Sequence, residues 1–246
     1  MPNSFVHLRV NSEYSLVDGL VRVKPLIKRV AELEMPAVGL TEQSNMCSLV
    51  RFYKAAMGAG VKPIIGADLW VENPDEPENP FRLTLLARNQ DGYRNLTEIV
   101  SRGYTEGQRF GIPIIQRKWL EDGREGLIAL SGGKIGDVGR ALLAEKADLA
   151  RERAQYWMSL YPGSFYLELQ RTGRTGDENC LHASVDLAEK LSCPVVATND
   201  VHFLYAEDFE AHEARVCRLR TRRVPARAHP AACARGACLR GPTLTT

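Results

Sequence analysis

His7-Leu8-Arg9-Val10-Asn11, followed by Tyr14-Ser15-Leu16-Val17-Asp18-Gly19, has the layout of a metal site at the end of a β-strand. Side chains alternate along a strand, so His7, Arg9 and Asn11 are expected on one face. Imidazoles at all three positions would make a strong cluster, but only one is present. Arginine is always charged and has no lone pair to offer a cation. We interpret the stretch as a metal-site layout in which protein charge has replaced the metal.

Short apolar runs rich in β-branched residues predict seven strands. They cover residues 5–10, 37–41, 63–71, 83–88, 126–131, 165–170 and 194–199. Segments with the helical spacing of apolar residues lie between them. This alternation indicates parallel strands joined by crossovers, which an open doubly wound sheet and a closed barrel both satisfy. Seven units over roughly 200 residues fit an α/β fold of the β/α-barrel (TIM-like) type.

The bulk composition is that of a globular chain. With 246 residues, 44% apolar and 25% charged, it can form one large domain or two small ones. It has no apolar run long enough for a membrane span, and its first residues lack the pattern of a secretion signal. The six cysteines show no CxxC pair, which disfavours a zinc ribbon or a disulfide framework. We expect a cytoplasmic protein with reduced thiols.

The last thirty residues differ in kind, which divides the chain into a domain at 1–216 and a tail at 217–246. The tail holds seven arginines and no Asp, Glu or Lys, so the first 216 residues carry a formal charge of −5. A basic disordered arm for nucleic acid is one interpretation. Translation of GC-rich DNA in the wrong frame is the other, and we favour it because the composition changes abruptly inside an expected helix that ends at Val216. The mildly acidic body does not favour nucleic-acid binding.

Two loops and two histidines complete this part of the pattern. The Pro- and acid-rich segment 72–80 predicts a solvated, hairpin-like excursion between two strands. Segment 131–136, Ser-Gly-Gly-Lys-Ile-Gly, could be a phosphate cradle, but a tight turn that uses glycine at positive φ is the favoured interpretation. His182 and His212 are expected at the surface or in helix caps.

Seven motifs occur in order between residue 5 and Val216. They are Phe5-Val6-His7-Leu8-Arg9-Val10, Tyr14-Ser15-Leu16-Val17-Asp18-Gly19, Lys62-Pro63-Ile64-Ile65-Gly66-Ala67, Leu85-Leu86-Ala87-Arg88-Asn89, Gly92-Tyr93-Arg94-Asn95-Leu96, Phe165-Tyr166-Leu167-Glu168 and Val196-Ala197-Thr198-Asn199-Asp200-Val201-His202. Together they closely resemble the amino-terminal polymerase-and-histidinol-phosphatase (PHP) domain of bacterial DNA polymerase III alpha subunits. The resemblance implies a distorted seven-stranded β/α barrel, here truncated at its C-terminal end.

In metal-binding members of this family, the barrel mouth holds up to three divalent ions thought to support phosphoester hydrolysis. The resemblance places the family's ligand positions on residues that have partly changed identity. These are Arg9, Asn11 and Asp18 in the first motif, Glu42 and Gln43 after Thr41, then Asp68, Arg82, Thr172, Asp200 and His202. Arginine cannot ligate, and Asn11, Gln43 and Thr172 are weak neutral ligands.

The remaining candidates, His7, Asp18, Glu42, Asp68, Asp200 and His202, could at most make one impoverished site. We therefore expect no metal; if one is held, Asp18, Asp68, Asp200 and His202 are the ligands. Carboxylates crowded without a cation repel one another. We expect Arg9 and Arg82 to supply the positive charge by pairing with Asp68, Asp200 or Asp18. For His7, a place in the core is favoured over ligation.

The resemblance implies a non-catalytic domain, with no catalytic residue of its own, that stabilises a replicative polymerase. It also implies docking of the separate proofreading exonuclease subunit, alongside other replicase subunits. Nucleotidyl transfer with Mg²⁺, and contact with DNA, would belong to later domains, and no membrane is expected. The alternative is a metal-dependent phosphoesterase that uses Mn²⁺ or Zn²⁺ at a reduced site. A third possibility, nucleic-acid binding through the arginine tail, requires that tail to be genuine.

Overall fold

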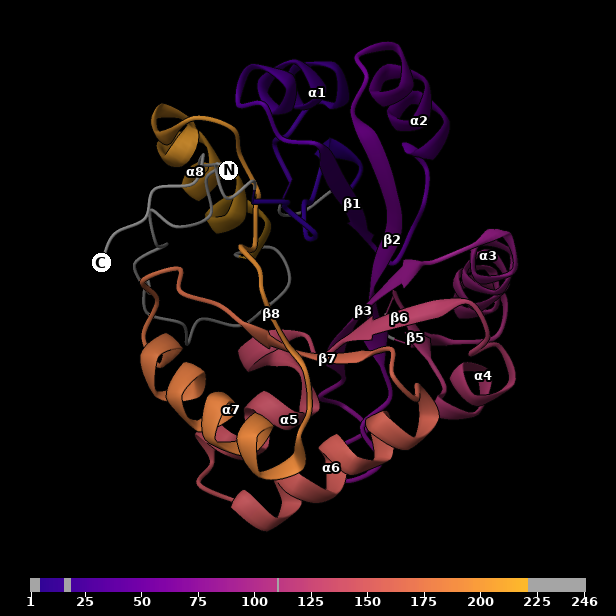
Figure 1. Cartoon of the computed structure of the whole chain (residues 1–246), viewed down its shortest axis with the longest axis vertical. Helices are drawn as coiled ribbons and strands as arrows, with labels where there is room; N and C mark the ends of the chain where they lie inside the picture. The colour runs from indigo at the N-terminus through magenta and orange to yellow at the C-terminus, as the bar shows by residue number, and fades with distance from the viewer. Residues whose placement is uncertain (1–4, 16–18, 110, 221–246) are drawn as a thin grey trace.

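Helices surround a central sheet in the computed structural model (Figure 1), which describes residues 5–15, 19–109 and 111–220, the last four of these by their backbone. The strands are β1 (Ala37–Gln43), β2 (Lys62–Val71), β3 (Phe81–Ala87), β4 (Gln108–Arg109), β5 (Ile112–Ile115), β6 (Leu127–Leu130), β7 (Phe165–Leu169) and β8 (Val195–Ala197). The α-helices are α1 (Val23–Glu32), α2 (Leu49–Gly58), α3 (Gln90–Thr105), α4 (Arg117–Asp122), α5 (Asp137–Leu143), α6 (Ala147–Leu160), α7 (Asp177–Leu191) and α8 (Phe209–Arg220). The predicted α/β class is confirmed.

The sheet is mixed rather than all parallel. Its order is β4-β5-β2-β3-β6-β7-β8, with β1 also paired to β2. The expectation of parallel strands throughout was wrong for β3, which runs antiparallel to both β2 and β6. The physical reason is the short connection at 72–80, because a parallel crossover needs a dozen or more residues. That segment forms the predicted hairpin, although Arg140 and Arg153 hold it by hydrogen bonds to Asn79, Pro80 and Asp75.

The strand ladders do not close into a barrel, and the gap between β8 and β1 is spanned by the N-terminal segment. Residues 5–10, predicted as the first strand, form only an isolated parallel bridge, between Val10 and Val201. Backbone N–H groups of β1 donate to this segment, with distances of 2.6 Å from Gly39 to the His7 oxygen and 3.0 Å from Thr41 to the Val10 oxygen. A Cβ on Gly39 would come within 2.5 Å of the Leu8 oxygen, so this close approach requires glycine. The seven predicted strand segments therefore lie side by side around the fold.

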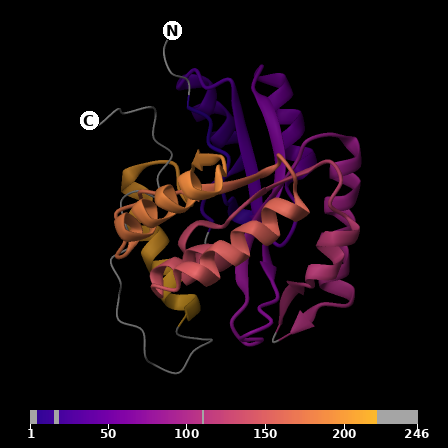
Figure 2. The ribbon, with the colours of Figure 1, turned by 60° about the horizontal axis from the view of Figure 1, so that its bottom comes forward.

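Two apolar clusters support this arrangement. The larger lies between β2, β3, β6 and β7 and the helices α3 to α7, with Trp157 fully buried in it. The smaller packs α1 and α2 against β1 and Val201. Figure 2 shows α6 and α7 side by side across one side of the sheet. The helices cover one face of these strands. The other face, which is more polar, lines the interior of the fold.

The C-terminal end of the described chain departs from expectation at one histidine. His212, on α8, is buried and its ring lies 5.4 Å from that of His202, so the prediction of a surface or capping residue was wrong. His182 is exposed as expected. The tail beyond residue 220 lies outside the described residues. Within them, no helix is long and apolar enough to cross a membrane.

Candidate functional site

Arg9 lies at the centre of a buried charge cluster, defined here as Arg9, Asp68, Arg82, Glu168, Arg174, Asp200 and His202. The Arg9 side chain has no exposed surface; its Nη2 donates to Asp68 Oδ2 at 2.7 Å. Its Nη1 lies 3.7 Å from Glu168 Oε1, and its Nε lies 3.5 Å from Asp200 Oδ1. Burial alone would lower the pKa of the guanidinium, but the three carboxylates outweigh burial and raise it. One side chain thus supplies positive charge to an acid on β2, an acid on β7 and an acid in the segment after β8.

Asp68, on β2, accepts from two arginines at the same oxygen. Arg82, on the antiparallel neighbour β3, donates from Nη2 to Oδ2, the oxygen that Arg9 also contacts. Thr84 Oγ1 lies 3.4 Å from the other oxygen, and the Arg82 guanidinium lies over the Trp70 ring at 5.0 Å. Burial raises the pKa of Asp68, but Arg82 and Arg9 more than reverse this and leave it below its ordinary value. The predicted pairing of both arginines with Asp68 is present.

Asp200 has two partners in the cluster besides Arg9. His202 Nε2 lies 3.0 Å from its Oδ2, and Arg174 Nη1 lies 3.3 Å from the same oxygen. Burial acts to raise the pKa of Asp200, but His202 and Arg9 together hold it well below its ordinary value. Asp200 is therefore ionised, and its oxygens already face cationic or N–H partners.

Glu168 is a member of the cluster that sequence reasoning missed. Its Oε2 accepts from the backbone N–H of Gly132 at 2.7 Å, and its Oε1 accepts from Thr198 Oγ1 at 2.7 Å. Burial raises the pKa of Glu168, and the attraction of Arg9 offsets this only in part. Gly132 sits at φ 77°, so the 131–136 segment contains the expected tight turn, and its N–H binds a carboxylate of the protein itself.

Glu42 lies outside the cluster, contrary to its place among the candidates. In the β1–β2 register Glu42 is beside Ala67, whereas Gln43 is beside Asp68. Since neighbouring side chains alternate, Glu42 points to the opposite face of the sheet from Asp68. There its two oxygens accept from three serine hydroxyls, at 2.5 Å from Ser12, 2.6 Å from Ser48 and 2.9 Å from Ser15.

The other sequence candidates have local partners. Asn11 is buried and its Oδ1 accepts from Ser15 Oγ at 3.3 Å, while the Gln43 backbone N–H donates to that hydroxyl at 3.1 Å. His7 is buried with its ring 4.9 Å from that of Phe5. Asp18 lies outside the described residues.

Thr172 is tied to the start of α7 rather than to the cluster. Its Oγ1 and its backbone N–H donate to Asp177 Oδ2 at 2.6 and 2.9 Å. Lys134 donates to the other oxygen of Asp177 at 2.5 Å. This second ion pair fixes the loop that follows β7, which also carries Arg174.

Comparison with protein families matches residues 7–172 to the PHP domain, about two thirds of the chain. The chain belongs to the PHP domain family. Among curated relatives, the DNA polymerase III subunit alpha of Pseudomonas aeruginosa is 59% identical over 217 residues, and that of Escherichia coli strain K12 is 50% identical over 212 residues. These matches cover 88% and 86% of this chain but only 18% of each relative. The chain thus spans about a fifth of the length of these polymerase subunits.

A solved structure shares the fold of this chain. An amidohydrolase from Chromobacterium violaceum superposes with a TM-score of 0.52 at 14% sequence identity, covering 85% of this chain and 96% of that one. This likeness concerns the fold alone. The expected distorted β/α architecture is confirmed, with the strand ladders open.

The donor set of the cluster does not fit the divalent ions of metal-binding PHP domains. The Arg9 guanidinium occupies the position between Asp68, Glu168 and Asp200 that a cation would need, with nitrogens within 3.7 Å of all three. Among the described residues, no group of three or more His, Cys, Asp and Glu side chains is arranged to hold a metal ion. In this PHP domain, cationic side chains neutralise the carboxylates.

Proposed function

We propose that this chain is the PHP-domain portion of a DNA polymerase III alpha subunit and acts in DNA replication as a metal-free scaffold. The observation that carries the proposal is the fully buried Arg9 among three carboxylates. A buried cation in this position ties the N-terminal segment to β2, β7 and the segment after β8. The role of Arg9 is to hold the domain together. The proposed scaffold does not catalyse phosphoester hydrolysis.

The relatives supply the rest of the proposal. They are DNA polymerase III alpha subunits, so the parent would be a cytoplasmic nucleotidyltransferase whose Mg²⁺-dependent active site and DNA contacts lie in other domains. The proofreading exonuclease subunit and other replicase subunits are its proposed partners, with the PHP domain docking the exonuclease. Mixing the full chain with that exonuclease subunit and following complex formation by sedimentation tests the docking role. Two independently sedimenting species would contradict it.

The metal-dependent phosphoesterase is not favoured as an alternative. Two relatives with 57% and 59% identity are polymerase subunits. Metal-dependent phosphoester hydrolysis needs metal ions bound by several side-chain ligands, and here Arg9 and Arg82 contact the carboxylate of Asp68 instead.

Dialysis of the full chain against Mn²⁺ and Zn²⁺, followed by metal analysis and an assay with a simple phosphodiester, tests the scaffold proposal. We expect no stoichiometric metal and no turnover. The proposal would be overturned if the chain bound nearly one metal ion per molecule and hydrolysed the phosphodiester, and if Asp200→Asn abolished that hydrolysis. Turnover would depend on Asp200 only if this residue bound the metal.

A further inference from the structure

Helix α2 exposes an apolar ridge. Val50, Tyr53 and Met57 are 61%, 48% and 57% exposed, although each is an apolar or aromatic side chain. Leu49, Tyr53 and Met57 are spaced four residues apart, and Val50 precedes Tyr53 by three, so the four side chains are neighbours on one helix surface. The opposite flank of the same apolar face, with Phe52 and Ala56, is buried in the core. Within the part of the chain that the structure describes, half of the apolar face of α2 therefore has no cover.

The connection from β2 to β3 explains why this ridge is uncovered. In a β/α barrel each strand is followed by a helix of the outer layer. Here β2 passes directly into β3 through the hairpin at 72–80, so no helix follows β2. The β2–β3 ladder starts only at Gly66, which leaves residues 62–65 of β2 beyond the end of β3. Pro63, Ile64 and Ile65 are accordingly half-buried rather than buried.

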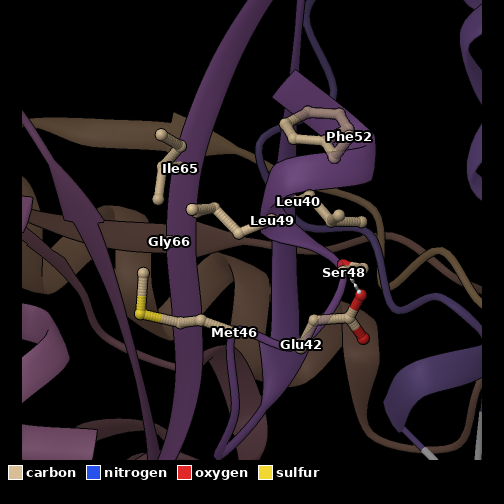
Figure 3. A pocket seen from close by; sticks show the side chains of 8 residues that line it. All are labelled: Leu40, Glu42, Met46, Ser48, Leu49, Phe52, Ile65 and Gly66. Atoms are coloured by element: carbon tan, nitrogen blue, oxygen red, sulfur yellow. Dashed lines mark hydrogen bonds between the residues drawn. The ribbon is translucent and has the colours of Figure 1, made fainter. Parts of the chain in front are cut away.

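A small hollow lies where the ridge meets β2 (Figure 3). Its empty space is about 190 Å³ when the open solvent at its mouth is included, and it is lined by Met46, Leu49 and Phe52 on the α2 side and by Ile65 and Gly66 on β2. Its lining is apolar apart from Glu42 and Ser48, which hydrogen-bond to each other at 2.6 Å. Leu49 is half-buried, lines the hollow and adjoins the ridge, because it precedes Tyr53 by one helical turn. The hollow is a shallow indentation with room for about one water-sized group.

The charged residues on α2 and at the start of β2 are all basic. Arg51 and Lys54 are exposed on α2, which has no acidic residue, and Lys62 is exposed at the start of β2. An apolar ridge flanked by basic side chains complements a helix that carries aliphatic residues on one face and carboxylates beside them.

We propose that the α2–β2 surface, comprising the Val50, Tyr53 and Met57 ridge, the hollow and the adjoining basic residues, docks an acidic amphipathic helix of a separate polypeptide. The aliphatic side chains of that helix would pack on Tyr53 and Met57 beside the hollow, and its carboxylates would face Arg51 and Lys54. This inference goes beyond the scaffold role, because it assigns a surface and a partner chemistry that the charge cluster does not require.

The test measures binding of two synthetic helix-forming peptides of about 16 residues to the full chain by fluorescence anisotropy. Both carry leucines at helical spacing; one has glutamates on the remaining face and the other has lysines. We expect the acidic peptide to bind at least about tenfold more tightly than the basic one, and Met57→Glu to weaken it about tenfold or more. Val185→Glu, on the exposed surface of α7, is the matched control and should leave binding unchanged.

Reversing the charge of Lys54 distinguishes specific electrostatic recognition from non-specific hydrophobic binding. Lys54→Glu should weaken the acidic peptide and strengthen the basic one. Equal affinity for the two peptides, binding that Met57→Glu leaves intact, or a ridge that instead pairs two copies of this chain in sedimentation would each overturn the proposal. Circular dichroism of each variant confirms that the fold is retained, and Tyr53→Ser serves as a second, milder ridge variant.

Discussion

Arg9 Nη2 lies 2.7 Å from Asp68 Oδ2, and both side chains are completely buried. The two residues are 59 positions apart, in the N-terminal segment and in β2. The N-terminal segment makes only an isolated β-bridge, to Val201. The ion pair joins this segment to β2, one of the longest strands of the sheet. The ion pair therefore compensates for the few backbone hydrogen bonds that hold this segment.

Replacing Arg9 by alanine should destabilise the domain by about 3–5 kcal/mol, because three carboxylates would remain buried without their common cation. Urea unfolding followed by circular dichroism measures this. Arg171→Ala is the matched control, since Arg171 pairs with Glu178 at the surface and such pairs contribute about 0–1 kcal/mol. Equal stability of Arg9→Ala and the parent would contradict the structural role of the cluster.

Arg82 and Arg9 share Asp68, so their effects should not add. Asp68→Asn removes the negative charge that both arginines contact, and once it is in place Arg82→Ala should cost less than it does alone. We expect a coupling free energy of about 0.5–3 kcal/mol from the double-mutant cycle. Strict additivity would show that the contact between Arg82 and Asp68 contributes little.

The pH dependence of stability should reflect the lowered pKa values of Asp68 and Asp200. A carboxyl whose pKa is lower in the folded state stabilises the fold fully above its unfolded-state pKa, about 3.9 for Asp. That stability is lost as the pH falls below this value and through the lower folded-state pKa. The raised pKa of Glu168 acts in the opposite sense, since its ionisation costs stability as the pH rises.

Thermal melts between about pH 5 and pH 2 should therefore show a falling Tm, and Asp200→Asn should flatten that fall. The exposed Asp186→Asn variant controls for the loss of one charge. A parallel acid slope in Asp200→Asn and the parent would place the acid sensitivity elsewhere.

Glu42 offers a prediction independent of the cluster. Glu42→Gln should destabilise the domain by about 1–3 kcal/mol, because an amide cannot accept three serine hydroxyls as a carboxylate does, and a buried polar group is left unsatisfied. Glu34→Gln, at an exposed position, is the control. Chemical denaturation of both variants decides the matter, and matching midpoints would show that the serines adapt to the amide.

Six of the seven predicted strand segments, and the ion pairs of Arg9 and Arg82 with Asp68, could be predicted because each depends on local pattern or on residue type. Residues 5–10 form only an isolated bridge. Runs of hydrophobic residues predict strands, and a buried arginine near acidic side chains is expected to form ion pairs with those side chains. The antiparallel direction of β3 depended on the length of its connection, which the alternation of strand and helix did not reveal.

The face on which Glu42 points depended on the register of β1 against β2, which no local pattern specifies. Glu168 was missed although the Phe165–Leu169 strand contains it. An acid inside an otherwise apolar strand was the available signal that it faces the interior of the fold.

The bridge between Val10 and Val201 joins residues 191 positions apart. Such a contact is slow to form, because a long loop must close before the contact gives any stability. At a synthesis rate of about 5–20 residues per second, roughly 10–40 seconds pass between the synthesis of Val10 and that of its bridge partner Val201. Asp200 precedes Val201, so the acids around Arg9 become complete at the same moment. The growing chain therefore carries an unfinished charge cluster until residues 200 and 201 have emerged, when assembly of the cluster and attachment of the first segment become a single folding event.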